Sequence, residues 1–168
     1  MNSLAEGSVG KGIAIGIANP HFEQLTVEDV ESRPSASIQY AYCSGIEAWT
    51  AVEFRRALSA ILRILEPSGT VRIATQNLDA IIYEYLLEWN SSHPAGMTRG
   101  QRLNAWRRSQ TARYVFNEED LRAELENAGF VDIWRLPAGA STIEIFRDCE
   151  QHEDMELVLE GRKPTLTE

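Results

Sequence analysis

The sequence predicts an α/β fold whose sheet is mostly parallel, with an antiparallel pair of strands at its C-terminal edge. Short apolar segments alternate along the chain with segments of helical periodicity, which is the order of a parallel sheet with helices on its faces. The last two predicted strands are joined by a polar connection, 137–154, that has no strong helical period. Because a parallel crossover is usually built around an α-helix, a connection without helical period allows an antiparallel pair.

Length and charge limit the possible partners. The 168 residues suit one domain, which we expect over 11–164, after a flexible N-terminus, 1–10, and before a tail, 165–168. With 25 Asp and Glu against 16 Lys and Arg, the net charge of −9 argues against general binding of nucleic acid. No apolar run reaches the length of a membrane helix, and residues 1–10 lack the features of a secretory signal. We therefore expect a cytoplasmic protein without a nucleic-acid or membrane partner.

The two cysteines predict no metal site. Cys43 and Cys149 lie far apart in the sequence and form neither a CxxC pair nor part of a metal-binding cluster. We interpret them as two reduced thiols, and we expect no bound metal.

Three strand candidates precede the first long helical pattern. They span 12–18, 25–30 and 37–43, and the second ends in acidic residues. Only residues 31–36 separate the second candidate from the third. Six residues are too few for a parallel crossover, which takes a dozen or more.

Helices dominate the middle of the chain. After Thr50, apolar residues recur at spacings of three and four as far as Leu65, and Pro67–Gly69 ends this helix. The later elements are predicted in this order: a strand at 70–75, helices at 79–89 and 99–113, a helix that begins after Asn117 and ends at Ala128–Gly129, and strands at 130–136 and 155–160.

Three blocks between residues 38 and 163 carry a family resemblance. The turn Leu65-Glu-Pro-Ser-Gly69 and the segment Gln76-Asn-Leu-Asp79 are similar to an L-x-P-G-G turn and a P-D-L-D segment, while 116–132 matches a pattern F-x-x-E-E-L-x-x-L-L-x-x-A-G-F. Residues 155–164 look like the closing strand of the same family. The chain thus resembles the class I S-adenosylmethionine-dependent methyltransferases of the type 11-like branch. The resemblance implies a Rossmann-like methyltransferase fold with S-adenosyl-L-methionine as cofactor.

The cofactor motif that the resemblance implies is degenerate. The family's first strand ends in G-x-G, and here Gly16 and Ala18 stand at the two glycine positions. An acid at the end of the second strand binds the ribose, a role that falls to Glu28 or Asp29, and Gly45 would line the methionine end of the cofactor. The family also has a helix and a third strand that this chain is too short to hold, so the N-terminal half is reduced. Either the adenine half of the pocket is missing, or 25–30 is not the second strand.

The resemblance also suggests where the acceptor substrate binds. Between Ser91 and Asn117 there are five arginines and no acidic residue, and in the family this insertion lies over the active-site mouth. The proposed substrate-binding residues are Arg99, Arg102, Arg107 and Arg108. Arginine suits phosphate and carboxylate groups, which favours an anionic substrate, unless these side chains pair with the protein's own acids. The candidate catalytic proton acceptors are Glu47 and Tyr42.

Two functions remain open at this stage. One is methyl transfer to a small anionic metabolite or glycan precursor. The alternative is a catalytically inactive or repurposed methyltransferase-like subunit for binding or assembly, which has lost the cofactor site. An exposed sheet edge left by the missing strand would also favour a homodimer or a partner subunit there.

Overall fold

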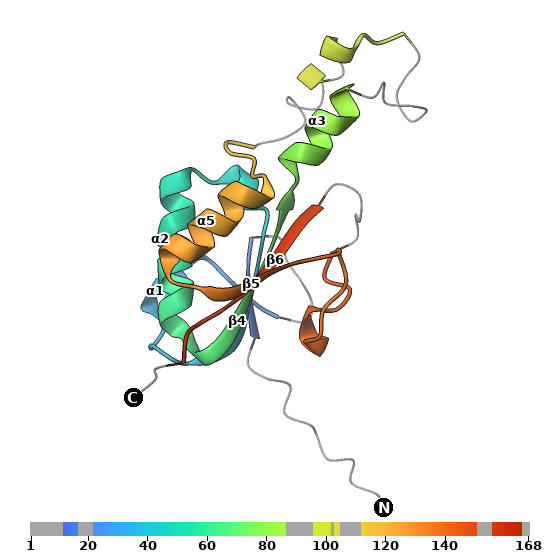
Figure 1. Cartoon of the computed structure of the whole chain (residues 1–168). Coiled ribbons are helices and arrows are strands. Elements are labelled where there is room, and N and C mark those ends of the chain that lie inside the picture. Colours follow the sequence, from blue (N-terminus) through green and yellow to red (C-terminus); the bar gives the residue numbers. More distant parts are fainter. Residues whose placement is uncertain are drawn as a thin grey trace, which may run out of the picture.

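Within residues 12–16, 22–86, 96–101, 103–104, 112–150 and 156–165, which the computed structural model describes, the chain forms one six-stranded sheet. The strands are β1 (Gly12–Ile15), β2 (Glu23–Leu25), β3 (Ile38–Ser44), β4 (Leu65–Gln76), β5 (Val131–Leu136) and β6 (Glu156–Arg162). Their order across the sheet is β2-β1-β3-β4-β6-β5. The first four pair in parallel, while β6 is antiparallel to both β4 and β5, as predicted (Figure 1).

Helices cover one face of this sheet. They are α1 (Val27–Ser32), α2 (Ala51–Ile64) and α5 (Glu118–Ala128), and α3 (Leu78–Leu86) extends beyond the sheet (Figure 1). The predicted starts of α2 and α5 and the predicted end of α5 are confirmed, whereas α2 already ends at Ile64 and Pro67–Gly69, predicted as a turn, lies within β4. Thr50 starts α2 with a side chain that accepts a hydrogen bond from the Glu53 amide, and Asn117 does the same for Asp120 at the start of α5. Gly129 ends α5 with a φ of 101°.

The predicted strand at 25–30 is wrong, and the structure shows why. Thr26 begins α1 through a capping box, in which its side chain accepts from the Asp29 amide and the Asp29 carboxylate accepts from the Thr26 amide. Strand β2 therefore ends at Leu25, and Glu28 and Asp29 belong to a helix. The whole connection 26–37 carries the chain from β2 to β3 on the far side of β1, so the crossover is long enough.

The predicted helix at 99–113 is only partly correct. Residues 99–101 and 103–104 are helical, but residues 112–115 are not. The Arg113 amide instead donates a hydrogen bond of 2.6 Å to the Glu47 carbonyl oxygen, and Phe116 forms a parallel bridge with Asn77. These backbone contacts tie the end of the segment to the carboxyl ends of β3 and β4.

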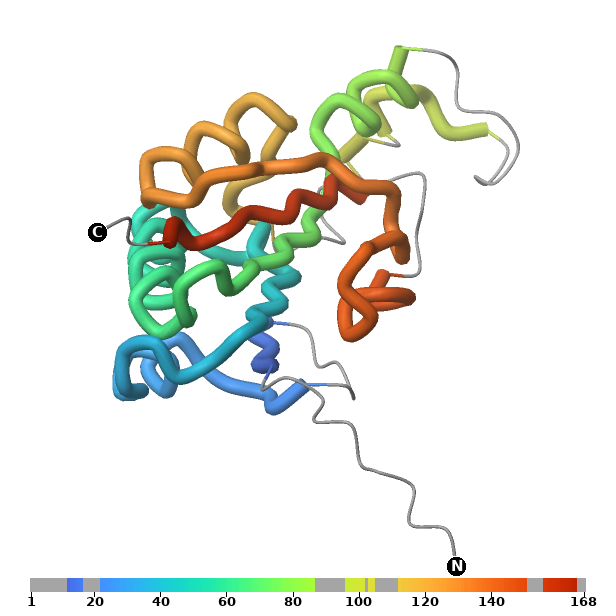
Figure 2. The backbone as a smooth tube through the Cα atoms, turned by 60° about the horizontal axis from the view of Figure 1, so that its bottom comes forward, coloured from blue at the N-terminus to red at the C-terminus, as the bar shows by residue number. Residues whose placement is uncertain are grey.

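Two apolar clusters fill the two faces of the sheet. The larger lies under the helices and includes Cys43, whose thiol is buried and whose pKa is raised to about 12 by burial and by the nearby Glu47 carboxylate. The smaller lies on the opposite face, where Phe22 stacks on Tyr42 and Phe146 with ring centroids 5.6 and 5.9 Å apart. Phe146 belongs to residues 137–150, called here the strap, which lies beside the sheet in Figure 2.

A buried arginine fixes the strap to the sheet. Arg72 of β4 is 0% exposed, and its Nε and Nη2 atoms donate to the two carboxylate oxygens of Glu150 over 2.8 and 2.6 Å. Its Nη1 donates to Glu160 of β6 over 2.7 Å and to the carbonyl oxygen of Ala140 over 3.0 Å. The Glu150 carboxylate also accepts from the Gly139 amide. On this face of the sheet the strap lies where helices cover the other face, and a buried ionic network around Arg72 holds it in place.

The two edges of the described sheet oppose pairing with another chain. Strand β2 is three residues long, and β5 carries an irregularity between Val131 and Trp134, where Asp132 has a φ of 48°. Short and irregular edge strands are poor templates for strand addition. A homodimer or partner subunit that binds at a sheet edge, as the sequence predicts, would therefore find no long and regular strand to pair with.

Among the described residues, no helix is both long and apolar enough to cross a membrane. In the same part of the chain, no group of three or more His, Cys, Asp or Glu side chains is arranged to hold a metal ion.

Candidate functional site

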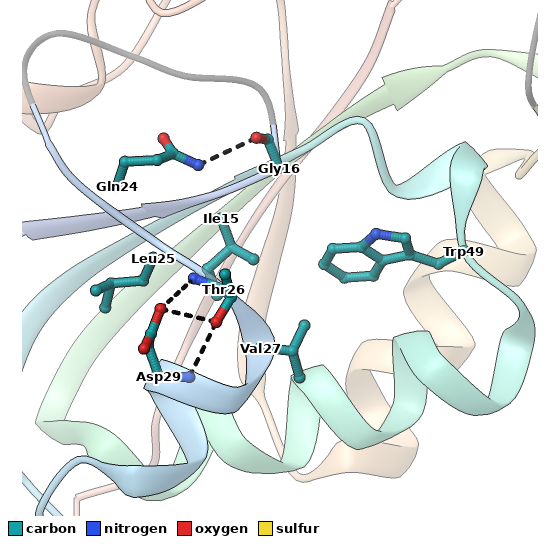
Figure 3. Close-up of a pocket in the computed structure, with 8 residues that line it drawn as sticks. All are labelled: Ile15, Gly16, Gln24, Leu25, Thr26, Val27, Asp29 and Trp49. Carbon is teal, nitrogen blue, oxygen red and sulfur yellow. Dashed lines mark hydrogen bonds between the residues drawn. The ribbon is translucent and has the colours of Figure 1, made fainter.

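The carboxyl ends of β1, β2 and β3 meet at one edge of the sheet, where open α/β folds bind their ligands. A cavity of about 360 Å³ lies at this edge (Figure 3). It is lined by Ile15 and Gly16 at the end of β1, by Gln24 and Leu25 of β2, by Thr26, Val27 and Asp29 at the start of α1, and by Trp49.

Gly16 is required by the packing of the strands around it. Its φ is 97°, and a Cβ atom at this position would lie 1.7 Å from the carbonyl oxygen of Ser44 at the end of β3. Its own carbonyl oxygen accepts a hydrogen bond of 3.1 Å from the Gln24 side chain. The close packing of β1 against β3 therefore explains why a glycine stands at position 16, and this explanation does not involve a bound ligand.

Asp29 supplies the carboxylate of the cavity. Its Oδ2 atom accepts hydrogen bonds from the amide and the hydroxyl of Thr26, over 2.9 and 2.7 Å (Figure 3). These bonds, the backbone one first, lower the pKa of Asp29 and keep it ionised at neutral pH. Within the described residues, no hydrogen bond involves the other oxygen, Oδ1. Of the two acids predicted for this site, Asp29 lines the cavity and the neighbouring Glu28 does not.

Trp49 gives the cavity an aromatic wall. Figure 3 shows its indole ring across from Thr26 and Val27. Behind it, ring contacts continue to Phe54 at 6.5 Å, from Phe54 to Phe116 at 5.0 Å and from Phe116 to Tyr114 at 4.6 Å. This row of aromatic rings joins the cavity to the C-terminal end of the arginine-rich stretch. From the sequence, Trp49 is expected to be a wall of the core rather than a substrate platform; the structure packs it against the core and also places it in the lining of the cavity.

Gly45 and Glu47 lie at the same edge of the sheet, but neither is among the residues that line the cavity. Gly45 has a φ of 70° and begins a short 3-10 turn, Ile46–Ala48. The Glu47 carboxylate is half-buried and accepts a hydrogen bond of 3.2 Å from the Thr75 hydroxyl of β4. Glu47 therefore lies near the carboxyl ends of β3 and β4, beside the cavity.

Tyr42 does not lie at this edge. It is 4% exposed, faces the strap, and its hydroxyl donates to the Cys149 carbonyl oxygen over 3.5 Å. Burial raises the pKa of Tyr42 well above its usual value, so the phenol stays protonated. The predicted role of proton acceptor does not fit this position, and Tyr42 is a core residue.

The structure describes only some of the remaining predicted site residues. Arg99 is exposed and helical, while Ala18, Arg102, Arg107 and Arg108 lie outside the described residues. Arg113, at the end of the arginine-rich stretch, has its guanidinium 3.8 Å from the carboxylate of Glu53.

No protein-family model matches the sequence, and no curated protein matches it. Solved structures do resemble the fold. One from Thermotoga maritima, described as an S-adenosylmethionine-dependent methyltransferase and possible histamine N-methyltransferase, has a TM-score of 0.56 at 15% identity, covering 92% of this chain and 82% of that one. Another such methyltransferase, from Archaeoglobus fulgidus, has a TM-score of 0.53 at 15% identity, with 84% and 68% covered.

Longer proteins also contain this fold. A phosphoethanolamine N-methyltransferase of Haemonchus contortus has a TM-score of 0.51 at 12% identity, and the match covers 85% of this chain but only 38% of that protein. These similarities show that the chain has the Rossmann-like fold of class I methyltransferases. At such low identity they show the fold alone.

Proposed function

We propose that this protein binds S-adenosylmethionine in the cavity between Gly16, Asp29 and Trp49 and transfers its methyl group to a small acceptor molecule. The observation that carries the proposal is Asp29, an ionised carboxylate that a capping box holds in the cavity where the fold binds ligands. The methyltransferase fold of the similar structures supports the same choice of cofactor.

The residues around the cavity fit an adenosine group. The volume falls within the roughly 300–1,000 Å³ typical of small-molecule sites. Ile15, Leu25 and Val27 give apolar walls, and Trp49 offers a ring against which a flat base packs. Asp29 would accept hydrogen bonds from the ribose hydroxyls, since a carboxylate accepts from two donors at once.

The remaining residues have simpler tasks in this proposal. When bound, S-adenosylmethionine supplies a methyl group activated by its sulfonium sulfur. Gly16 and Gly45 shape the turns that bound the site, and alignment of the two reactants supplies much of the rate in such transfers. Glu47 is the nearest candidate to accept a proton from the acceptor, because its carboxylate lies beside the cavity at the ends of β3 and β4.

An anionic acceptor is supported by charge. The arginine-rich stretch 91–117 contains no acidic residue in a chain of net charge −9, and Arg99 within it is exposed. We assign acceptor binding to Arg99, Arg102, Arg107 and Arg108. A metabolite or glycan precursor with phosphate or carboxylate groups fits these side chains.

The substitution Asp29→Asn tests where the cofactor binds. We expect S-adenosylhomocysteine to bind at least about tenfold more weakly to this variant, because hydrogen bonds to a charged group contribute most to affinity. The side-chain oxygen of the asparagine can still accept a hydrogen bond from the Thr26 amide, so the capping box of α1 and the fold are retained. Isothermal titration calorimetry measures the change.

The matched control is Glu53→Gln. Glu53 occupies the same capping-box position in α2 that Asp29 occupies in α1, but it does not line the cavity. Its replacement should leave the affinity unchanged. Equal weakening by both variants would show that helix capping, and not a contact to the ligand, explains the effect of Asp29→Asn.

A further inference from the structure

Three polar side chains gather on the face of the sheet that the strap covers, at the ends of three neighbouring strands. Ser44 ends β3, Gln76 ends β4 and Glu156 begins β6. Gln76 and Glu156 are direct partners across the strands, while Ser44 is the partner of Ala74, two residues before Gln76 on the same face. The spacing of strands and residues in a sheet puts such neighbours within about 8 Å of each other. We call Ser44, Gln76 and Glu156 the polar triplet.

Two oxygen atoms of the polar triplet are buried without a hydrogen bond. Ser44 is only 5% exposed, and neither its Oγ atom nor the Oε1 atom of the half-buried Gln76 has a hydrogen-bond partner among the described residues. The Ser44 hydroxyl lies near the phenol of Tyr42, but that phenol donates to the Cys149 carbonyl oxygen. Most buried polar atoms in proteins are hydrogen-bonded, because burial without a partner is costly. Both oxygens can therefore accept hydrogen bonds from a ligand.

The surroundings of the polar triplet are negatively charged. Glu156 contributes one carboxylate. Glu150 and Glu160 contribute two more, which share the guanidinium of Arg72. Burial, followed by the charge of Glu150 and then that of Glu156, raises the pKa of Tyr42, so these carboxylates lie close to its phenol. Because Arg72 compensates only one of the three negative charges, this part of the face favours a cation over an anion.

We propose that the polar triplet binds the ammonium group of a small primary amine. An alkylammonium group has three N–H donors and no acceptor. These donors match the oxygens of Ser44 and Gln76 and the carboxylate of Glu156. Gln76 and Glu156 are half-buried, so an amine can approach from solvent on their side. Hydrogen bonds from a charged donor would compensate for the hydration that the buried oxygens lose on folding.

The amine would lie next to the cavity proposed for the cofactor. The carbonyl oxygen of Ser44 is the atom that Gly16 approaches, and Gly16 lines that cavity. An acceptor with an ammonium group at one end and an anionic group at the other would fit both this site and the anionic acceptor proposed above. Binding of the amine itself does not require S-adenosylmethionine, so it is measured without the cofactor and is tested separately from methyl transfer.

NMR titration of the isotope-labelled whole protein with butylamine tests this site. We expect saturable shifts at the side-chain amide of Gln76 and at the backbone amides of Ser44 and Glu156. Tetramethylammonium has the charge but no N–H donor, and butanol has no charge, so each should bind at least about tenfold more weakly. Gln76→Leu and Glu156→Gln should each weaken butylamine binding at least about tenfold, the effect of losing a hydrogen bond that involves a charged group.

Gln39→Leu is the matched control, because Gln39 is an exposed glutamine near the opposite end of β3 from Ser44. It should change neither butylamine binding nor stability. Gln76→Leu should instead raise the urea midpoint of the unliganded protein, because it removes a buried oxygen without a hydrogen bond. A lower midpoint would overturn the proposal, since the oxygen would then be bonded within the protein. So would equal binding of butylamine and butanol, or an unchanged affinity of both variants of the polar triplet for butylamine.

Discussion

Replacing Gly16 with alanine is expected to destabilise the protein severely. The left-handed φ of 97° strains any side chain, and the new Cβ atom would lie 1.7 Å from the Ser44 carbonyl oxygen. Backbone strain and overpacking each cost about 1–3 kcal/mol, so we expect a loss on the order of 4 kcal/mol in the free energy of unfolding. Urea unfolding followed by circular dichroism measures it.

Gly96→Ala separates the two causes. Gly96 has a similar φ of 103°, but no heavy atom lies within 4 Å of the added Cβ. Only the strain should remain, about 1–2 kcal/mol. If the two variants lost equal stability, the close approach of β1 to β3 at Gly16 would not be the dominant effect.

The substitution Arg72→Met is expected to have the second large effect. It leaves the carboxylates of Glu150 and Glu160 in a buried site without their cation. Removing one partner of a buried ionic network costs about 3–5 kcal/mol, and we expect the strap to detach from the sheet. Urea unfolding gives the stability, and limited proteolysis within 137–150 reports the release of the strap.

A control and a rescue test the reason for this effect. Arg55 also binds a carboxylate through two nitrogens, that of Glu124, but its side chain is 63% exposed. Arg55→Met should therefore change stability little. Adding Glu150→Gln and Glu160→Gln to Arg72→Met should restore part of the loss, because no buried charge would then remain. No rescue would indicate that the volume and packing of Arg72, and not its charge, hold the strap.

Local signals explain which parts of the fold the sequence predicts well. The caps at Thr50 and Asn117 and the stop at Gly129 are set by residues within one turn, so α2 and α5 are predictable. The mostly parallel character of the sheet follows from the alternation of strands and helices. By contrast, the apolar spacing of 25–30 suggests a strand, and only the capping pair Thr26 and Asp29 identifies α1.

Contacts between distant residues explain what the sequence does not predict. Arg72 lies within a predicted strand, but its partners Glu150 and Glu160 are 78 and 88 residues away. The strap therefore has no local pattern that reveals its function. Tyr42 is a similar case, because it is buried in a cluster in which Phe22 stacks on it and Phe146, from the distant strap, stacks in turn on Phe22.

The candidate site also combines residues that the sequence predicts with residues whose position depends on the tertiary fold. Gly16 and Asp29 were predicted from a motif at the ends of strands, and both line the cavity. Gly45 and Glu47 were predicted for the same site and lie beside it. Trp49 depends on how the turn after β3 folds over β1, which the sequence alone does not show.

Calorimetric titration of the whole protein with S-adenosylmethionine and S-adenosylhomocysteine tests the central proposal most directly. We predict saturable binding to one site in the micromolar range, weakened by Asp29→Asn and not by Glu53→Gln. A folded protein that gives no heat of binding at millimolar cofactor would contradict the proposal. The methyltransferase fold would then serve the alternative role of a binding or assembly subunit.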